Sequence, residues 1–184
     1  MQLEIEMKAK LADPQKTELQ LPALGYVLER KYRKEDFYFR AANSQEVRVR
    51  LDAAQSLVTF KDKQIEGGLE INREHEFEIS NAALMIELLG RLGCVEIVQK
   101  TKIGSAWRKD LLLAELSDIV GLGHYLEIEC VLVVPDETSA AEQSRLGREI
   151  KIQIVGELAA LGIGQSQIES RTYTAMLREL KSAL

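Results

Sequence analysis

Charged and apolar side chains alternate through most of the extended segments of this chain, and this pattern restricts the fold more than any other feature. At residues 4–10, an extended backbone places Glu4, Glu6 and Lys8 on one face of a strand and apolar side chains on the other. The pattern returns at residues 46–51, 57–61, 69–79 and 127–130. Each such strand has one face to bury and one charged face to accommodate.

Turn and helix signals between these segments indicate how they connect. Helices are expected from Pro14 to Gly25, at 82–92, at 136–161 and at 172–180, and glycines at 67–68 and 121–123 mark turns. Strands are expected at 3–11, 26–39, 46–51, 57–61, 69–79, 94–102, 107–116 and 124–130. Short connections between successive strands predict an antiparallel sheet. No linker or internal repeat divides the chain, so a single domain over residues 1–184 is expected.

The charged faces can be accommodated in two ways. An open sheet would turn them to water, whereas a closed sheet would pack its apolar faces outward against helices and line a tunnel with charge. Because the charges cluster by sign along each strand, we favour the second arrangement. The predicted fold is therefore of the α+β class, a closed eight-stranded antiparallel β-barrel with flanking helices.

Carboxylates crowded in such a tunnel would repel one another at reduced dielectric unless cations neutralise them. Oxygen-only ligands favour Mg²⁺ or Mn²⁺, and Mg²⁺ shares its coordination shell with substrate phosphates. We expect two such ions. The candidate metal ligands are Glu4, Glu6, Glu76, Glu78, Glu127 and Glu129.

The cations of the same faces need an anion of matching charge, and a triphosphate supplies one. The candidate phosphate-binding residues are Lys8, Arg48, Arg50, Lys61, Lys100 and Lys102. The alternative for Arg48 and Arg50 is a solvated sheet edge, where charges discourage aggregation. Tyr38 and Tyr173 are expected to pack half-buried with satisfied hydroxyls, although a partnership between Lys8 and a tyrosine is conceivable.

Composition excludes several classes of protein. A formal net charge of -5 argues against a nucleic-acid surface. No apolar run approaches the length of a membrane span, and the first residues, which lack a cationic region followed by an apolar stretch, predict no secretory signal. Cys94 and Cys130 lie in no paired motif, which favours reduced thiols and a cytoplasmic location. The helix at 136–161 has a mixed charged face that is expected to meet solvent, with a homodimer contact as the alternative.

These residues resemble the CYTH domain family, also called triphosphate tunnel metalloenzymes. The opening at 4–8 is similar to the signature of that family, and the other matching motifs follow in its order. They lie at residues 36–39, 48–50, 59–61, 73–78, 100–102, 121–129 and 170–173. The resemblance spans almost the full chain. It implies an eight-stranded tunnel that binds a triphosphate with divalent metal ions, and it implies Glu6, Lys8 and Glu129 as catalytic residues.

Two positions depart from the family pattern. The acidic residue common before the bend at 121–123 falls on Ser117, with Asp118 beside it and Glu115 on the same face. Lys102 stands where many members have arginine, which keeps the charge but loses the bidentate geometry.

The resemblance is greatest to class IV adenylyl cyclases, because of the Asp-x-Tyr-Phe motif at 36–39 and the Gly-Leu-Gly bend before Glu127. Such an enzyme converts ATP into cyclic AMP and pyrophosphate. A triphosphatase that hydrolyses inorganic triphosphate, thiamine triphosphate or a nucleoside triphosphate is the alternative. A non-catalytic module that binds nucleotides or polyphosphate is the second alternative.

Overall fold

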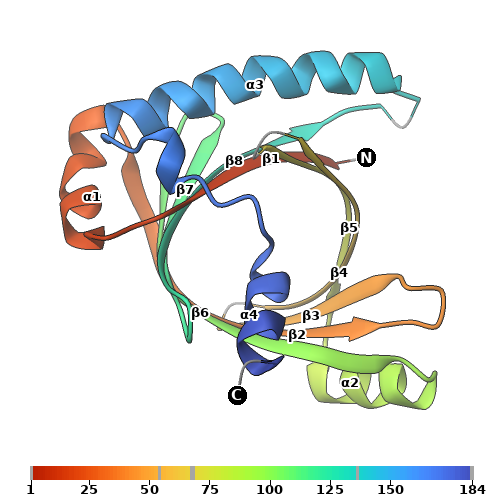
Figure 1. Cartoon of the computed structure of the whole chain (residues 1–184). Coiled ribbons are helices and arrows are strands. Elements are labelled where there is room, and N and C mark those ends of the chain that lie inside the picture. Colours follow the sequence, from red (N-terminus) through yellow and green to blue (C-terminus); the bar gives the residue numbers. More distant parts are fainter. Residues whose placement is uncertain (1, 54, 67–68, 136, 183–184) are drawn as a thin grey trace.

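Eight antiparallel strands close into a barrel in this protein (Figure 1). The structure is a computed structural model, and it describes residues 2–53, 55–66, 69–135 and 137–182. Around the barrel the strands follow the order β1-β5-β4-β3-β2-β6-β7-β8. Their bounds are β1 Gln2–Lys10, β2 Val27–Arg40, β3 Glu46–Asp52, β4 Ser56–Glu66, β5 Leu69–Ile79, β6 Val95–Lys109, β7 Leu112–Ile119 and β8 Gly123–Val133. The predicted closed eight-stranded antiparallel barrel is confirmed.

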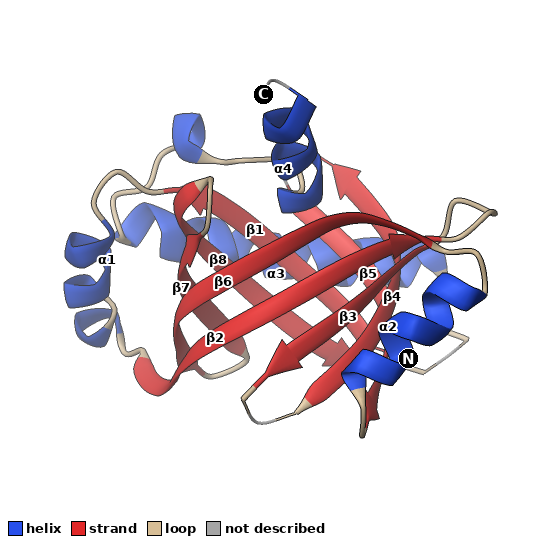
Figure 2. Ribbon diagram, turned by 90° about the horizontal axis from the view of Figure 1, so that it is seen from below, coloured by secondary structure: helices blue, strands red, loops and turns tan. Residues whose placement is uncertain are grey.

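Helices cover parts of the outside of the barrel and one of its ends (Figure 2). Their bounds are α1 Pro14–Gln20, α2 Ala82–Arg91, α3 Ala140–Ala160 and α4 Tyr173–Ser182, with short 3₁₀ turns at Pro22–Leu24 and Gln165–Gln167. The long helix α3 runs along the outside, across β1 and β8, and α4 lies at one opening of the barrel (Figure 1). In the described residues, no helix is both long and apolar enough to span a bilayer.

The period-two pattern of β1 explains why the barrel closes as it does. Leu3 and Ile5 are fully buried on the outer face, where they belong to the main apolar core with residues of α3 such as Ile154. The opposite side chains of β1, among them Glu4 and Lys8, point into the barrel and line its interior. A shift of one residue in strand register would exchange the two faces, so burial of the apolar face determines the register.

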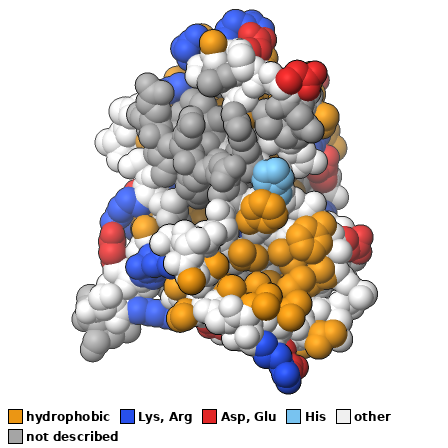
Figure 3. All heavy atoms as spheres, turned by 90° about the vertical axis from the view of Figure 1, so that its right-hand side faces the viewer, with side chains coloured by type: hydrophobic (Ala, Val, Ile, Leu, Met, Phe, Trp, Pro, Cys, Tyr) orange, Lys and Arg blue, Asp and Glu red, His pale blue; other side chains and the backbone are white. Residues whose placement is uncertain are grey.

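The outer face of β4 and β5 is covered less completely. Apolar side chains gather on this side of the molecule (Figure 3). Phe60 and Phe77 are partly exposed there, and the ring of Phe60 stacks on His75 with 4.7 Å between centroids. A smaller core that includes Val49, Val58 and Leu89 joins this part of the sheet to α2.

Several predicted boundaries were wrong. The strand expected at 107–116 does not exist as one element, because β6 continues to Lys109 and β7 begins at Leu112. The turn between them uses Asp110 at a φ of 51°, a left-handed conformation that aspartate tolerates better than most residues. Helix α3 begins later than predicted, because the side chain of Ser139 accepts a hydrogen bond from the backbone of Glu142 and caps it. The glycine turn expected at 67–68 lies outside the described residues.

Candidate functional site

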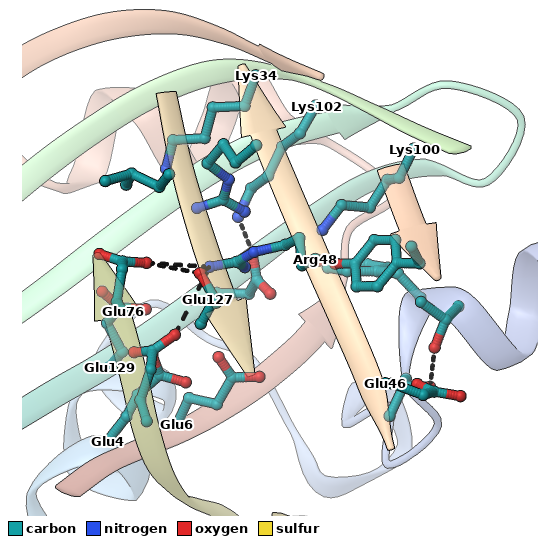
Figure 4. Close-up of a pocket in the computed structure, with 18 of the residues that line it drawn as sticks. Glu4, Glu6, Lys34, Glu46, Arg48, Glu76, Lys100, Lys102, Glu127 and Glu129 are labelled. Carbon is teal, nitrogen blue, oxygen red and sulfur yellow. Dashed lines mark hydrogen bonds and ion pairs between the residues drawn. The ribbon is translucent and has the colours of Figure 1, made fainter. Parts of the chain in front are cut away.

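The interior of the barrel is a cavity of about 650 Å³ whose lining is dominated by charged side chains. Most of its acidic residues lie on one side and most of its basic residues on the other (Figure 4), with Glu46 of β3 and Lys8 of β1 as exceptions. We call one side the acidic wall, formed by Glu4, Glu6, Glu74, Glu76, Glu127 and Glu129 of β8, β1 and β5. We call the other the basic wall, formed by Lys34, Arg48, Arg50, Lys100 and Lys102 of β3, β2 and β6. Each wall comes from three neighbouring strands of the barrel.

The basic wall is organised by one buried carboxylate. Asp36 is 1% exposed and accepts hydrogen bonds from Arg50 Nε at 2.7 Å and Arg50 Nη2 at 2.9 Å, and it pairs with Lys100 Nζ at 3.0 Å. Burial alone would raise the pKa of Asp36, but Lys100 and Arg50 outweigh it and hold the pKa well below its usual value. Asp36 therefore stays ionised and fixes two cations of the basic wall in place.

A second cluster links the basic wall to the acidic wall through β7. Glu115 accepts a hydrogen bond from Lys34 Nζ and another from Lys102 Nζ, each at 2.5 Å, and Lys102 also pairs with Glu127. Burial lowers the pKa of Lys34 to about 8, with the attraction of Glu115 opposing it and the repulsion of Lys102 adding to it. Burial would raise the pKa of Glu115, yet the two lysines lower it below its usual value. Glu115 is therefore an ionised carboxylate shared by two lysines.

The three residues named at the Ser117 departure from the family pattern lie in different surroundings. Ser117 is buried and its hydroxyl lies 2.8 Å from the hydroxyl of Tyr32, while Asp118 is exposed and lies 3.8 Å from His124. Glu115 is the residue of this strand whose carboxylate enters the cavity.

Carboxylates of the acidic wall lie opposite one another on neighbouring strands. Glu6 of β1 lies directly opposite Glu129 of β8, and Glu4 accepts a hydrogen bond from Asn72 Nδ2 at 2.9 Å. Burial, followed by repulsion from Glu4, Glu115 and Glu6, raises the pKa of Glu129 well above its usual value. Like charges placed opposite each other destabilise a sheet. A bound cation would remove this repulsion.

The donors of the acidic wall suit a hard divalent cation, because carboxylate oxygens are the ligands that Mg²⁺ and Mn²⁺ prefer. In the part of the chain that the structure describes, no three acidic, histidine or cysteine side chains form a ready-made coordination shell. The fit therefore rests on the chemistry of the donors and on the raised pKa of Glu129. Phosphate oxygens and water would complete the shell.

Tyrosines lie beside the cations of the tunnel. Tyr38 donates a hydrogen bond to Asp36 at 3.4 Å, as expected for a satisfied hydroxyl. Tyr173 contacts Lys8 and Lys100 through its ring, but its hydroxyl is buried and has no hydrogen-bond partner among the described residues. The prediction of a satisfied hydroxyl was therefore wrong for Tyr173.

Most of the predicted site residues line this cavity. They are Glu4, Glu6, Lys8, Arg48, Arg50, Glu76, Lys100, Lys102, Glu127 and Glu129. The solvated-edge alternative for Arg48 and Arg50 was wrong, because their side chains are only 11% and 14% exposed. Glu78 is exposed and does not line the cavity. The backbone of Lys61 belongs to β4, but its side chain lies outside the described residues.

Several residues that line the cavity were missing from the predicted site, and three of them are charged residues of the two walls or of the cluster that links the walls. Lys34, Glu74 and Glu115 all face the cavity. Each lies two residues from a residue of a family motif or from the Ser117 position, so the alternation of the strand already placed it on the inner face. Alternation identifies the face, but it does not show which positions along a tilted strand reach the cavity.

Known proteins resemble this chain in sequence and in fold. The sequence model of the CYTH domain matches residues 2–159. A Methanocaldococcus jannaschii protein named "putative adenylate cyclase" is 29% identical over 133 residues, covering 69% of this chain and 76% of that protein.

Solved structures agree at the level of the fold. A Pyrococcus horikoshii protein superposes with a TM-score of 0.79 at 24% identity, over 94% of this chain and 98% of that one. A Hippeastrum protein described as having a dominant triphosphatase activity superposes with a TM-score of 0.66 at 18% identity, over 97% of this chain and 96% of that one.

Proposed function

Because this chain belongs to the CYTH domain family, we propose that its tunnel binds ATP together with divalent cations and converts it into cyclic AMP and pyrophosphate. The observation that carries this proposal is the pair of oppositely charged walls facing each other across one cavity (Figure 4). The M. jannaschii relative, by its name, supports the cyclase. CYTH triphosphate tunnel enzymes generally depend on divalent metal ions.

The basic wall would bind the phosphate chain. Arg48 and Arg50 carry guanidinium groups that can grip phosphate oxygens in pairs, while Lys100 and Lys102 act as compact charges. Asp36 already holds Arg50 and Lys100 in place, so little side-chain ordering remains to be done when the ligand arrives. Lys61 stays in the proposal on the strength of its sequence motif alone.

The acidic wall would hold Mg²⁺ or Mn²⁺, and we propose two ions. Glu4, Glu6 and Glu129 are the principal ligands, with Glu76 and Glu127 on the same wall. When bound, the metal neutralises phosphate charge and stabilises the charge that develops during phosphoryl transfer. We leave Glu78 out of this set because it is exposed and lies outside the cavity.

In the cyclase reaction the ribose 3′-hydroxyl loses its proton to solvent and its oxygen forms a bond to the innermost phosphorus. The bond from that phosphorus to the bridging oxygen breaks, and pyrophosphate leaves. The chain's own residues position the reacting atoms and balance charge. Lys8 lies 3.9 Å from Glu6 and beside Tyr173, where its ammonium would neutralise a phosphate oxygen. Glu6 and Glu129 would act by holding the cation.

A triphosphatase is the second candidate. In that reaction a water molecule attacks the terminal phosphorus, the bond from that phosphorus to the bridging oxygen breaks, and orthophosphate separates from the shortened phosphate chain. The same two walls would bind the substrate. The charged lining would bind the phosphate chain whichever nucleophile attacks. The Hippeastrum protein with this fold is described as having a dominant triphosphatase activity.

Incubation of the purified protein with ATP and Mg²⁺ or Mn²⁺ separates the candidates by their products. Cyclic AMP with pyrophosphate supports the cyclase, orthophosphate supports the triphosphatase, and tight binding without product indicates a non-catalytic module. Glu6→Gln should abolish metal-dependent turnover without unfolding the protein. Glu78→Gln, the matched control on the neighbouring strand, should leave turnover unchanged, and equal activity in both variants would contradict the site.

A further inference from the structure

Tyr173 carries a buried hydroxyl group whose lack of a hydrogen-bond partner has no explanation within the protein alone. The side chain is 6% exposed and lines the cavity, and its oxygen has no hydrogen-bond partner among the described residues. A buried polar group left without a partner destabilises the folded state. Such groups are rare in folded proteins and commonly mark a functional role or a missing ligand.

The position of Tyr173 is determined by the surrounding packing. Its ring packs edge-on against Tyr125, with 5.1 Å between the centroids and an interplanar angle of 84°. Tyr125 in turn donates a hydrogen bond to the sulfur of Met176 at 3.7 Å. On the other side, the backbone of Glu169 donates a hydrogen bond to the carbonyl oxygen of Lys8 at 2.9 Å. These contacts attach the segment from Glu169 to Met176 to the barrel and hold the ring of Tyr173 in place.

The surroundings of the ring are those of an anion site. The ammonium groups of Lys8 and Lys100 each lie 5.1 Å from the ring centroid, so two cations of the tunnel lie close to Tyr173. Burial, followed by the repulsion of Glu127, raises the pKa of the Tyr173 hydroxyl well above its usual value. At neutral pH the group is therefore protonated and available as a hydrogen-bond donor.

We propose that Tyr173 is a substrate-binding residue whose hydroxyl donates a hydrogen bond to a phosphate oxygen held between Lys8 and Lys100. The inference rests on the proposed function and adds a residue from the C-terminal helix to the phosphate site. It also gives α4 a role, since the first residue of this helix completes the tunnel at the end where the helix lies (Figure 1).

The test compares Tyr173→Phe with Tyr125→Phe, a matched control that removes a hydroxyl from the adjoining ring. Binding of imidotriphosphate, whose nitrogen bridges resist hydrolysis, is measured by calorimetry with Mg²⁺ present. A hydrogen bond to a charged group is worth about 1.5–3 kcal/mol, so Tyr173→Phe should raise the Kd roughly 10- to 100-fold. Tyr125→Phe should change it less than about threefold.

Thermal unfolding without ligand distinguishes substrate binding from a structural role. Because the Tyr173 hydroxyl has no partner in the protein, Tyr173→Phe should leave the ligand-free Tm unchanged or raise it. A lowered ligand-free Tm, or an equal loss of affinity in Tyr125→Phe, would overturn the inference. Wild-type affinity in Tyr173→Phe would also overturn the inference, although the proposed function would survive that result. Failure of the wild-type protein to bind imidotriphosphate would overturn both.

Discussion

Replacing Asp36 with asparagine should destabilise the protein strongly, because this carboxylate neutralises two buried cations. It is 1% exposed, and it contacts Arg50 at 2.7 and 2.9 Å and Lys100 at 3.0 Å. Removing one partner of a buried ion pair costs about 3–5 kcal/mol, mainly because the remaining charge is left uncompensated. For a chain of this length, each kcal/mol lowers the Tm by about 2–4 °C, so a decrease of roughly 6–20 °C is expected.

The pH dependence of this loss is determined by the pKa of Asp36. Lys100 and Arg50 hold the folded-state pKa below the unfolded value of about 3.9, despite the opposing effect of burial. The stabilisation is therefore complete above the unfolded pKa and is lost as the pH falls through the folded pKa. The difference in unfolding free energy between wild type and Asp36→Asn should be constant from neutral pH to about pH 4 and should shrink at lower pH.

Urea unfolding of wild type and Asp36→Asn, followed by circular dichroism at several pH values, measures this difference. Glu87→Gln is the control, because Glu87 pairs with Arg91 on the exposed face of α2 and should change stability by no more than about 0.5 kcal/mol. Imidotriphosphate should raise the Tm of Asp36→Asn more than that of wild type, since it supplies negative charge to the same cations. A loss below about 1 kcal/mol for Asp36→Asn would refute the reasoning.

Three further substitutions test other parts of the structure. Arg50→Ala should weaken imidotriphosphate binding, measured by calorimetry, by about 2–5 kcal/mol. Arg40 does not line the cavity, so Arg40→Ala should change the binding free energy by only about 0.3 kcal/mol. Glu129→Gln should raise the Tm of the metal-free protein by relieving carboxylate repulsion and should abolish the stabilisation by Mg²⁺; a normal response to Mg²⁺ would argue against this ligand. Gly104→Ala should lower the free energy of unfolding, measured in urea, by about 1–3 kcal/mol or more, because a Cβ there would lie 2.1 Å from the carbonyl oxygen of Leu116. Unchanged stability would contradict this packing.

The closed barrel could be predicted from the sequence because its determinants are local. Alternation along β1 assigns Leu3 and Ile5 to one face and Glu4 and Glu6 to the other, whatever the strand pairs with. Short turns between successive strands then require antiparallel neighbours. A closed barrel then places the charged faces of all the strands around one shared interior.

The roles of individual charges could not be predicted in the same way, because they depend on neighbours distant in sequence. Glu115 and Lys34 meet only because β2 and β7 flank β6. Glu78 lies on the same face of β5 as Glu74 and Glu76. Among the described side chains of this strand, Glu74 and Glu76 line the cavity and Glu78 does not, since strand tilt decides which positions lie inside. The turn at Asp110 escaped prediction because it contains neither glycine nor proline.

The central claim is that a triphosphate and divalent cations occupy the space between the two walls. A crystal structure with imidotriphosphate and Mn²⁺, with the metal located by anomalous scattering, tests this claim most directly. We expect manganese peaks beside Glu6 and Glu129, and phosphate density between them and the Arg50 and Lys100 side chains. Manganese and phosphate bound outside the barrel, with the tunnel containing only water, would contradict the claim.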